Sequence, residues 1–201
     1  MRSVLETERL ALRRFTMADV DLLCELDSDP AVMRYLNGGT ATPRAVIVSD
    51  VLPAFLHSYA PIDGFGVWAA LAKDNGDFIG WFSLRPLNGA DAQDVTLGYR
   101  LRQAAWGRGY ATEGARALLR QGFTKLGVQR VFATTYEYND ASRRVMEKIG
   151  MTLVRSFRFT SAELVAESET HVASQTVWDG DEVEYSLGRA DWERLVGSSA
   201  E

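Results

Sequence analysis

The sequence predicts a mixed α/β (α+β) fold with a mostly antiparallel central sheet, in a single domain over residues 1–201. The stretches FGVWAAL (65–71) and DFIGWFSL (77–84) flank Lys-Asp-Asn-Gly, and Asn-Gly between apolar strands is a strong hairpin signal. A third strand, VTLGYRL (95–101), follows directly. The next helical pattern leads into strand VQRVFATT (128–135), and such a crossover is compatible with a parallel neighbour.

The chain begins with a strand and a helix. RLALRRF (9–15) alternates apolar and polar residues, which predicts the first strand. Thr16 is followed three residues later by Asp19, a spacing that resembles a capping box. We therefore expect a helix that opens there and runs through Leu26.

Proline residues mark the boundaries of the next segment. Asp29-Pro30 is expected to interrupt the chain. Thr42 and Pro43 supply an N-cap and a first-turn proline for a second helix. Pro53 is expected to kink or split that helix, because proline lacks the N–H that an internal helical position needs.

The second half of the chain alternates between helices and strands. Gly98 within the third strand marks a bulge or a close backbone approach. A helix from Asp140 to Ile149 is followed by Gly150, a suitable C-terminal cap. Two last strands and a short closing helix, DWERL, complete the predicted order β-α-α-β-β-β-α-β-α-β-β; the strands are MTLVRSFRF (151–159) and EVEYSLG (182–188).

Composition limits the classes of function. The formal net charge is −5 and no lysine–arginine run is present, so we expect no nucleic-acid partner. Cys24 alone cannot form a cysteine zinc cluster, and only His57 and His171 could supply imidazole, so we expect no metal. The N-terminal stretch lacks an apolar signal core, and no long apolar run occurs. We therefore expect a cytoplasmic protein without a membrane partner.

A glycine-rich segment precedes the central helix. In WGRGYATEGARALL (106–119), Gly107 and Gly109 stand directly before the helical pattern. Such an entry can present free backbone N–H groups to a phosphate, or it can be a tight strand-to-helix turn. The lysine and hydroxyl residue of a P-loop are missing, and Thr112 stands where a dinucleotide fingerprint has its third glycine.

Two motifs carry a resemblance to a known family. The segment WGRGYATE, together with NDASRRVMEKIGM further on, resembles the GNAT acetyltransferases, and the chain looks closest to the branch that acetylates ribosomal-protein N-termini. The resemblance covers most of the chain. It implies acetyl-coenzyme A as the acetyl donor and two central strands that splay apart. It also implies that the pantetheine arm lies between those strands, paired with the first of them like an added strand.

The resemblance implies a set of cofactor-binding residues. Backbone groups of the strand at 97–101 would lie beside the thioester, and the glycine loop would bind the pyrophosphate. Ala104 departs from the family pattern, which often has Gln or Arg there, but the backbone contacts do not depend on that side chain. The implied residues are Leu97, Tyr99, Leu101, Gly107, Arg108, Gly109, Tyr110, Ala111, Thr112, Asn139 and Ser142. Asn139 and Ser142 would equally suit the cap and first turn of a helix.

The catalytic residues stay open at this stage. Many relatives carry a glutamate at the position of Thr96, which cannot act as a base. Tyr136 and Tyr138 are candidates to protonate the departing thiolate. The remaining candidates are the carboxylates, hydroxyl and imidazole that the family layout brings near the cleft: Asp94, Glu137, Ser142, Glu169 and His171.

The sequence thus predicts an N-acetyltransferase that moves an acetyl group to a primary amine by direct transfer in a ternary complex. The acceptor is a protein N-terminus or a small amine. The alternative is a non-catalytic GNAT-like module that binds or senses acyl-coenzyme A. A homodimer is compatible with the sequence. An acidic segment, residues 160–182, is expected to border the acceptor side of the cleft.

Overall fold

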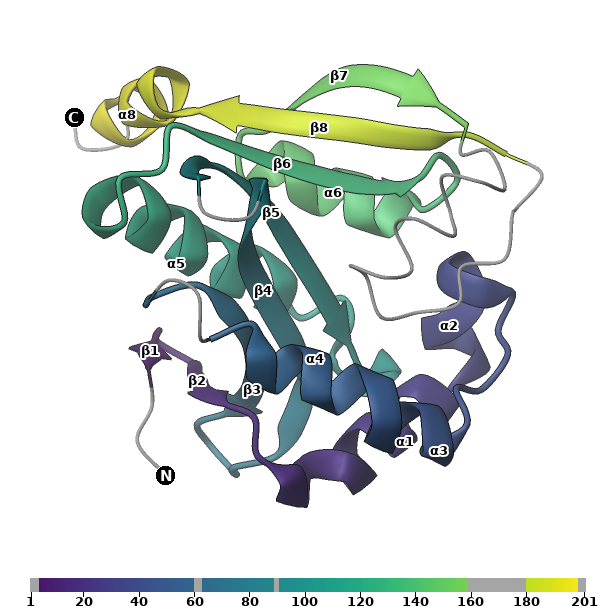
Figure 1. Cartoon of the computed structure of the whole chain (residues 1–201). Helices are drawn as coiled ribbons and strands as arrows, with labels where there is room; N and C mark the ends of the chain where they lie inside the picture. The colour runs from purple at the N-terminus through teal and green to yellow at the C-terminus, as the bar shows by residue number, and fades with distance from the viewer. Residues whose placement is uncertain (1–3, 60–62, 89–90, 159–179, 199–201) are drawn as a thin grey trace.

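The protein, seen here as a computed structural model, is built around one eight-stranded sheet (Figure 1). The structure describes residues 4–59, 63–88, 91–158 and 180–198. The spatial order of the strands is β1-β2-β3-β4-β5-β6-β8-β7. The strands are β1 (Leu5–Glu6), β2 (Leu10–Arg14), β3 (Gly66–Ala72), β4 (Phe78–Asn88), β5 (Asp91–Leu101), β6 (Arg130–Tyr136), β7 (Thr152–Phe157) and β8 (Glu182–Gly188).

The predicted hairpin and its neighbours form an antiparallel half-sheet. β1 to β5 pair in sequence order, and Gly76 takes a φ of 78° in the β3–β4 turn. Gly98 lies in register with Ser83 and no bulge occurs there. A Cβ at this position would stand 2.7 Å from Ser83 Oγ, so the close approach is confirmed.

Four α-helices lie between β2 and β3 in the described residues, two more than the predicted order has, and one of the two arises because the second predicted helix is split before Pro53: α1 (Val20–Ser28), α2 (Pro30–Asn37), α3 (Arg44–Val46) and α4 (Leu52–His57). The missed helix is α2. The interruption expected at Asp29-Pro30 is confirmed, because α1 ends at Ser28 and Asp29 is extended, but a new helix starts there: the Asp29 carboxylate accepts the Ala31 N–H at 2.9 Å and Pro30 occupies the first helical turn.

Of the other predicted boundaries in this region, the one at Thr42-Pro43 is wrong by one residue, because Pro43 itself is the N-cap of α3 and no side chain caps that helix, while those at Thr16 and Pro53 are confirmed. The Thr16 N–H donates to the Asp19 carboxylate at 2.7 Å, the bond that a capping box supplies. Helix α1 follows after a short 3₁₀ turn, Met17–Asp19. Pro53 splits the later helix as expected, because a π-helical turn, Ile47–Val51, separates α3 from α4 just before it.

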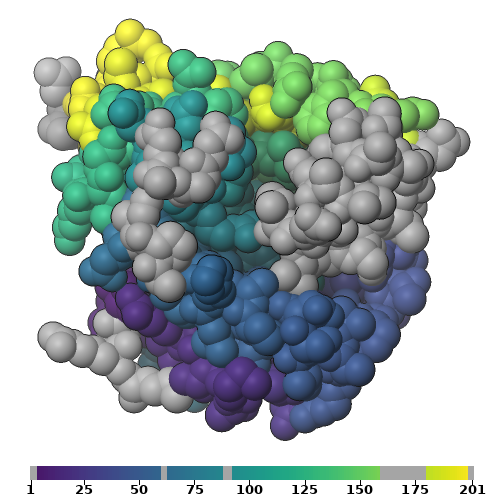
Figure 2. Space-filling model, in the orientation of Figure 1, coloured from purple at the N-terminus to yellow at the C-terminus, as the bar shows by residue number. Residues whose placement is uncertain are grey.

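The second half of the chain adds a parallel crossover and a C-terminal hairpin. Helix α5 (Tyr110–Lys125) joins β5 to β6, and α6 (Asp140–Lys148) joins β6 to β7. β8 lies between β6 and β7, antiparallel to both, before helix α8 (Arg189–Gly197). Strands β7 and β8 therefore lie on the side of β6 that faces away from β5. They occupy the upper part of the face that Figure 2 shows.

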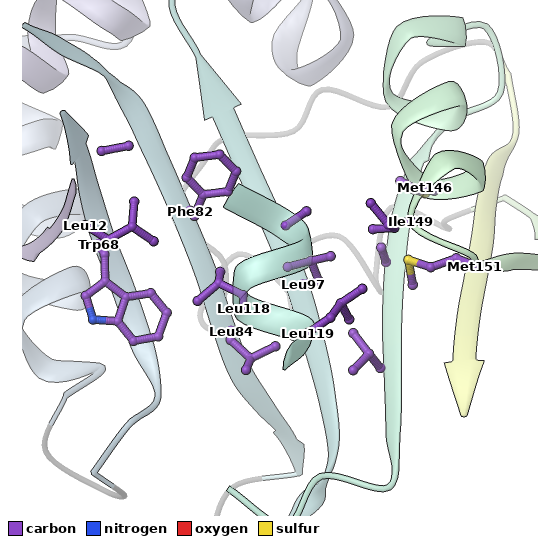
Figure 3. Close-up of a cluster of buried hydrophobic side chains, with 14 of the residues drawn as sticks. Leu12, Trp68, Phe82, Leu84, Leu97, Leu118, Leu119, Met146, Ile149 and Met151 are labelled. Carbon is purple, nitrogen blue, oxygen red and sulfur yellow. The ribbon is translucent and has the colours of Figure 1, made fainter. Parts of the chain in front are cut away.

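The sheet separates two hydrophobic clusters. One lies under α5 and α6, where Figure 3 shows Phe82, Leu84 and Leu97 beside Leu118 and Leu119 of α5. The other lies against α1 and α4; it contains Phe15, Leu23, Leu26, Leu52, Phe55, Val67 and Phe78. Odd and even residues of the strands therefore face different helices, which fixes what each side of the sheet can offer a ligand.

Candidate active site

β5 and β6 are paired over only three residues of each strand. Residues 94–96 of β5 lie in parallel register with residues 130–132 of β6. Past this point the strands diverge toward their carboxyl ends, as Figure 1 shows. The splayed pair that the resemblance implies is therefore present.

The edge of β5 that borders this divergence offers backbone groups to a ligand. The Arg102 N–H donates to the Ile79 carbonyl of β4 at 2.9 Å. In an antiparallel pair, residues bonded to one neighbour alternate with residues whose backbone groups face the other side. The N–H and C=O groups of Leu97, Tyr99 and Leu101 are therefore directed toward β6, where pairing has ended.

The glycine loop lies at the open end of the divergent strands, directly after β5. Gly107 and Gly109 have φ values of 70° and 82°, in the left-handed region where glycine is favoured, and Gly109 is the N-cap of α5. In the part of the chain that the structure describes, nothing accepts hydrogen bonds from the N–H groups of residues 110–112. A helix N-terminus with free N–H groups and no side-chain cap suits an anionic group such as a pyrophosphate.

A cluster of polar side chains fastens this loop to the first strands. The Glu113 carboxylate accepts from Thr7 Oγ1 at 2.6 Å and from the Arg9 N–H at 2.9 Å. Arg9 Nη1 donates to the Arg108 carbonyl at 2.9 Å. Burial raises the pKa of Glu113, but the hydrogen bonds from Thr7 and Arg9 outweigh it and hold that pKa below its ordinary value. The loop is thus held in place before any ligand binds.

Helix α6 begins at the same open end, after β6. Asn139 is its N-cap and accepts the Ser142 N–H at 3.3 Å, while Asn139 Nδ2 donates to Thr135 Oγ1 at 3.1 Å. The capping role that the residue type allows is therefore present. Its contact with the coenzyme stays a prediction.

Tyr99 connects β5 to α6 across the divergence. Its hydroxyl lies 3.0 Å from Ser142 Oγ and donates to the Ser142 carbonyl at 3.2 Å. Burial raises the pKa of Tyr99 to about 12, although the Ser142 hydrogen bond opposes the shift. The phenol therefore stays protonated at neutral pH and can donate. Sequence inspection assigned Tyr99 only a backbone role, because its partner lies 43 residues away in the chain.

The two candidate tyrosines at the end of β6 differ in exposure. Tyr136 is buried and stacks on Tyr35 of α2, with ring centroids 5.9 Å apart. Tyr138 is 63% exposed and packs edge-on against Tyr136 at 5.4 Å. They form one aromatic cluster on the α2 side of the sheet.

Glu137 forms hydrogen bonds with the backbone of Asp181, the residue just before β8. Its carboxylate accepts the Asp181 N–H at 2.9 Å, and its own N–H donates to the Asp181 carbonyl at 2.9 Å. Arg143 donates to the Glu137 carbonyl at 3.0 Å. These three hydrogen bonds hold the end of β6 in place.

The remaining residues considered from the sequence lie on β5 or outside the described ranges. Asp94 belongs to the short paired stretch of β5, and Thr96 is the last residue of that stretch, where the divergence begins. Glu169 and His171 lie outside the described residues, as does most of the acidic segment 160–182. Within the described ranges, no cluster of three His, Cys, Asp or Glu residues could hold a metal ion, and no helix has the length and apolarity needed to span a membrane.

Comparisons with known proteins give consistent matches. The acetyltransferase (GNAT) domain family matches residues 9–152. The chain is 30% identical over 197 residues to the FsC-acetyl coenzyme A-N(2)-transacetylase of Aspergillus fumigatus, covering 95% of this chain and 78% of that protein. A GNAT-family acetyltransferase structure from Bacillus anthracis superposes with a TM-score of 0.73 at 23% identity, over 92% of this chain and 98% of that one. RimL, a ribosomal L7/L12 α-N-protein acetyltransferase solved with coenzyme A, superposes with a TM-score of 0.72 at 14% identity, over 93% and 98%, a likeness of fold alone.

Proposed function

Because the chain belongs to the GNAT acetyltransferase family and is an acetyl-coenzyme A-dependent N-acetyltransferase, we propose that it transfers the acetyl group directly to a primary amine held in a ternary complex. The observation that carries this proposal is the divergence of β5 from β6 beside the glycine loop. The acceptor is a protein N-terminus, as in the ribosomal branch, or a small amine.

Each part of the open end has a proposed partner on the coenzyme. The N–H groups at the start of α5, with Gly107 and Gly109, bind the pyrophosphate. The exposed edge of β5 pairs with the pantetheine amides as an added strand would, through the backbone of Leu97, Tyr99 and Leu101. Strand pairing along this edge brings the thioester between β5 and the first turn of α6.

The transfer needs an oxyanion site and two proton movements. The amine nitrogen bonds to the thioester carbonyl carbon, and the resulting oxyanion is stabilised by a backbone N–H of β5. The carbon–sulfur bond then breaks; the nitrogen loses a proton and the coenzyme A thiolate gains one. Thr96 cannot accept the proton from nitrogen, so we propose that it leaves to solvent.

The hydrogen-bonded pair of Tyr99 and Ser142 is the proposed donor to the thiolate. Tyr99→Phe and Ser142→Ala are each expected to lower kcat about 10²-fold, with little change in the KM for acetyl-coenzyme A. The double variant is expected to lose little more than either single one, because the two hydroxyls act as a unit. Stopped-flow measurement of thiol release checks this, and fully additive losses would contradict a shared role.

The proposed activity itself is tested by thiol release from acetyl-coenzyme A with a panel of peptides and small amines. We expect release that depends on an amine and matches the N-acetylated product one to one. If the protein binds acetyl-coenzyme A tightly but no amine in the panel causes thiol release, the result would instead favour the non-catalytic binding module.

Replacement of Asn139 separates its two roles. Asn139→Ala removes the cap of α6 and is expected to cost about 1 kcal/mol of stability. If the Asn139 side chain also contacts the pantetheine arm, as we propose, the KM for acetyl-coenzyme A should rise as well. The matched control is Asp29→Ala, which removes the cap of α2. Thermal melts should show similar losses for both variants, and an unchanged KM in Asn139→Ala would leave only the capping role.

A further inference from the structure

Arg85 of β4 is a partly buried cation without an ionic partner. Its Nε atom is closed to solvent and makes no hydrogen bond, and no carboxylate in the described part of the chain forms a salt bridge with it. Burial lowers the pKa of the guanidinium, and no charged group is among the causes. Arginine nevertheless stays protonated at neutral pH. The charge is not balanced within the described part of the chain, so the guanidinium is available to an anionic ligand.

The strand register fixes which side of the sheet Arg85 faces. Arg85 lies opposite Thr96 of β5, and Ser83, two residues earlier, lies opposite Gly98. Directly opposite residues of an antiparallel pair project to the same side, with Cβ atoms about 5 Å apart. The near contact between Ser83 Oγ and the Gly98 position confirms the assignment. Arg85 and Thr96 therefore share one face.

The acceptor amine is expected to reach the thioester from this face. The opposite face is covered by α5 and α6, against which Phe82, Leu84 and Tyr99 pack. Thr96 is in register with Phe132, and alternation along β6 puts Tyr136 on the Arg85 side, where it meets Tyr35 of α2. An amine that approaches between β5 and β6 from this side passes Arg85.

The charges on this face select the ligand. Arg100, on the same side of β5, is paired with Asp27 at 2.6 Å, whereas the charge of Arg85 has no carboxylate partner among the described residues. One carboxylate balances it, whereas a phosphate dianion would leave a surplus negative charge. The planar guanidinium fork matches the two oxygens of a carboxylate.

We propose that Arg85 is a specificity-determining residue that binds the carboxylate of the acceptor, so that the substrate class is a small amino acid with both a free amine and a free carboxylate. This inference rests on the proposed function, because it places the amine beside Thr96 at the mouth of the thioester site. A bond from the guanidinium to a carboxylate is charge-assisted, and its loss should weaken binding about 10- to 100-fold.

The test is calorimetric binding of amino acids, and of their amides, to the protein saturated with coenzyme A. Wild type is expected to bind at least one amino acid about tenfold or more tightly than its amide. Arg85→Gln should abolish that preference, and Arg85→Lys should retain part of it. The control is Arg120→Gln, which removes the same charge from an exposed position on α5 and should keep the preference in full.

Melting curves complete the design. Ligand-free Arg85→Gln is expected to melt no lower than wild type, since it removes a partly buried charge that has no partner in the described part of the chain; this separates lost binding from lost folding. A preference that survives in Arg85→Gln, or a wild type that does not distinguish any amino acid from its amide, would overturn the proposal. If no amine in the panel promotes thiol release while the carboxylate preference in binding persists, the acetyl-transfer proposal fails and the Arg85 site stands.

Discussion

Replacement of Asp27 by asparagine is expected to lower the free energy of unfolding by about 3–5 kcal/mol. Asp27 of α1 and Arg100 of β5 form a salt bridge of 2.6 Å, and their side chains are only 3% and 10% exposed. Arg100 also lies over the Trp81 ring at 5.3 Å. Removing the carboxylate charge leaves the guanidinium buried without compensation, and that desolvation cost is the source of the loss.

The matched control is an exposed pair that joins neighbouring elements of the same region. Asp21 of α1 pairs with Arg44 of α3, with side chains 82% and 60% exposed. Asp21→Asn is expected to change stability by less than about 1 kcal/mol, because water already screens that pair. Urea unfolding of both variants checks the difference. Equal small losses would show that water compensates Arg100 and that the buried pair is not a structural anchor.

Local signals predicted most of the elements. Asn75-Gly76 indicated the hairpin because Gly76 supplies the positive φ in the turn between Ala72 and Asp77, and Thr16 indicated a helix start through one local hydrogen bond. Asp29-Pro30 carried an equally local signal for α2, a capping carboxylate before a first-turn proline. Interpreting that proline only as a breaker concealed the helix.

The spatial order of the strands in the sheet could not be predicted from local sequence patterns. The two C-terminal strands were predicted, but the insertion of β8 between β6 and β7 depends on pairing partners that lie about 50 residues apart in the chain, such as Val131 with Leu187. No local propensity encodes such an order. The splay of β5 from β6 entered through a family resemblance and not through periodicity.

Some residues of the candidate site were indicated by local sequence signals, whereas others depend on contacts that only the fold creates. Gly107 and Gly109 were recognisable because positive φ restricts the residue type at one position. The Tyr99–Ser142 pair and the unpartnered Arg85 depend on neighbours brought together by the fold. For Arg85 a signal was present, since an arginine within the apolar run FIGWFSLRPL is unusual for a buried strand.

Replacement of Gly109 by valine is expected to weaken binding of acetyl-coenzyme A at least tenfold. Gly109 has a φ of 82° and is the N-cap of α5, so a β-branched residue there would force the backbone away from its present course. The N–H groups that follow would turn from the proposed pyrophosphate position. Losing one or two charge-assisted hydrogen bonds, each worth roughly 1.5–3 kcal/mol, accounts for the expected loss.

Gly76 provides the comparison that separates backbone strain from lost binding. Its φ of 78° nearly equals that of Gly109, and a Cβ there would meet no atom within 4 Å. Gly76→Val should therefore incur a similar conformational cost in the β3–β4 turn and leave coenzyme affinity unchanged. Calorimetry on both folded variants measures the difference. An unaltered affinity in Gly109→Val would remove the loop from the coenzyme site, whereas equal weakening in both variants would show that strain alone, transmitted through the sheet, sets the affinity.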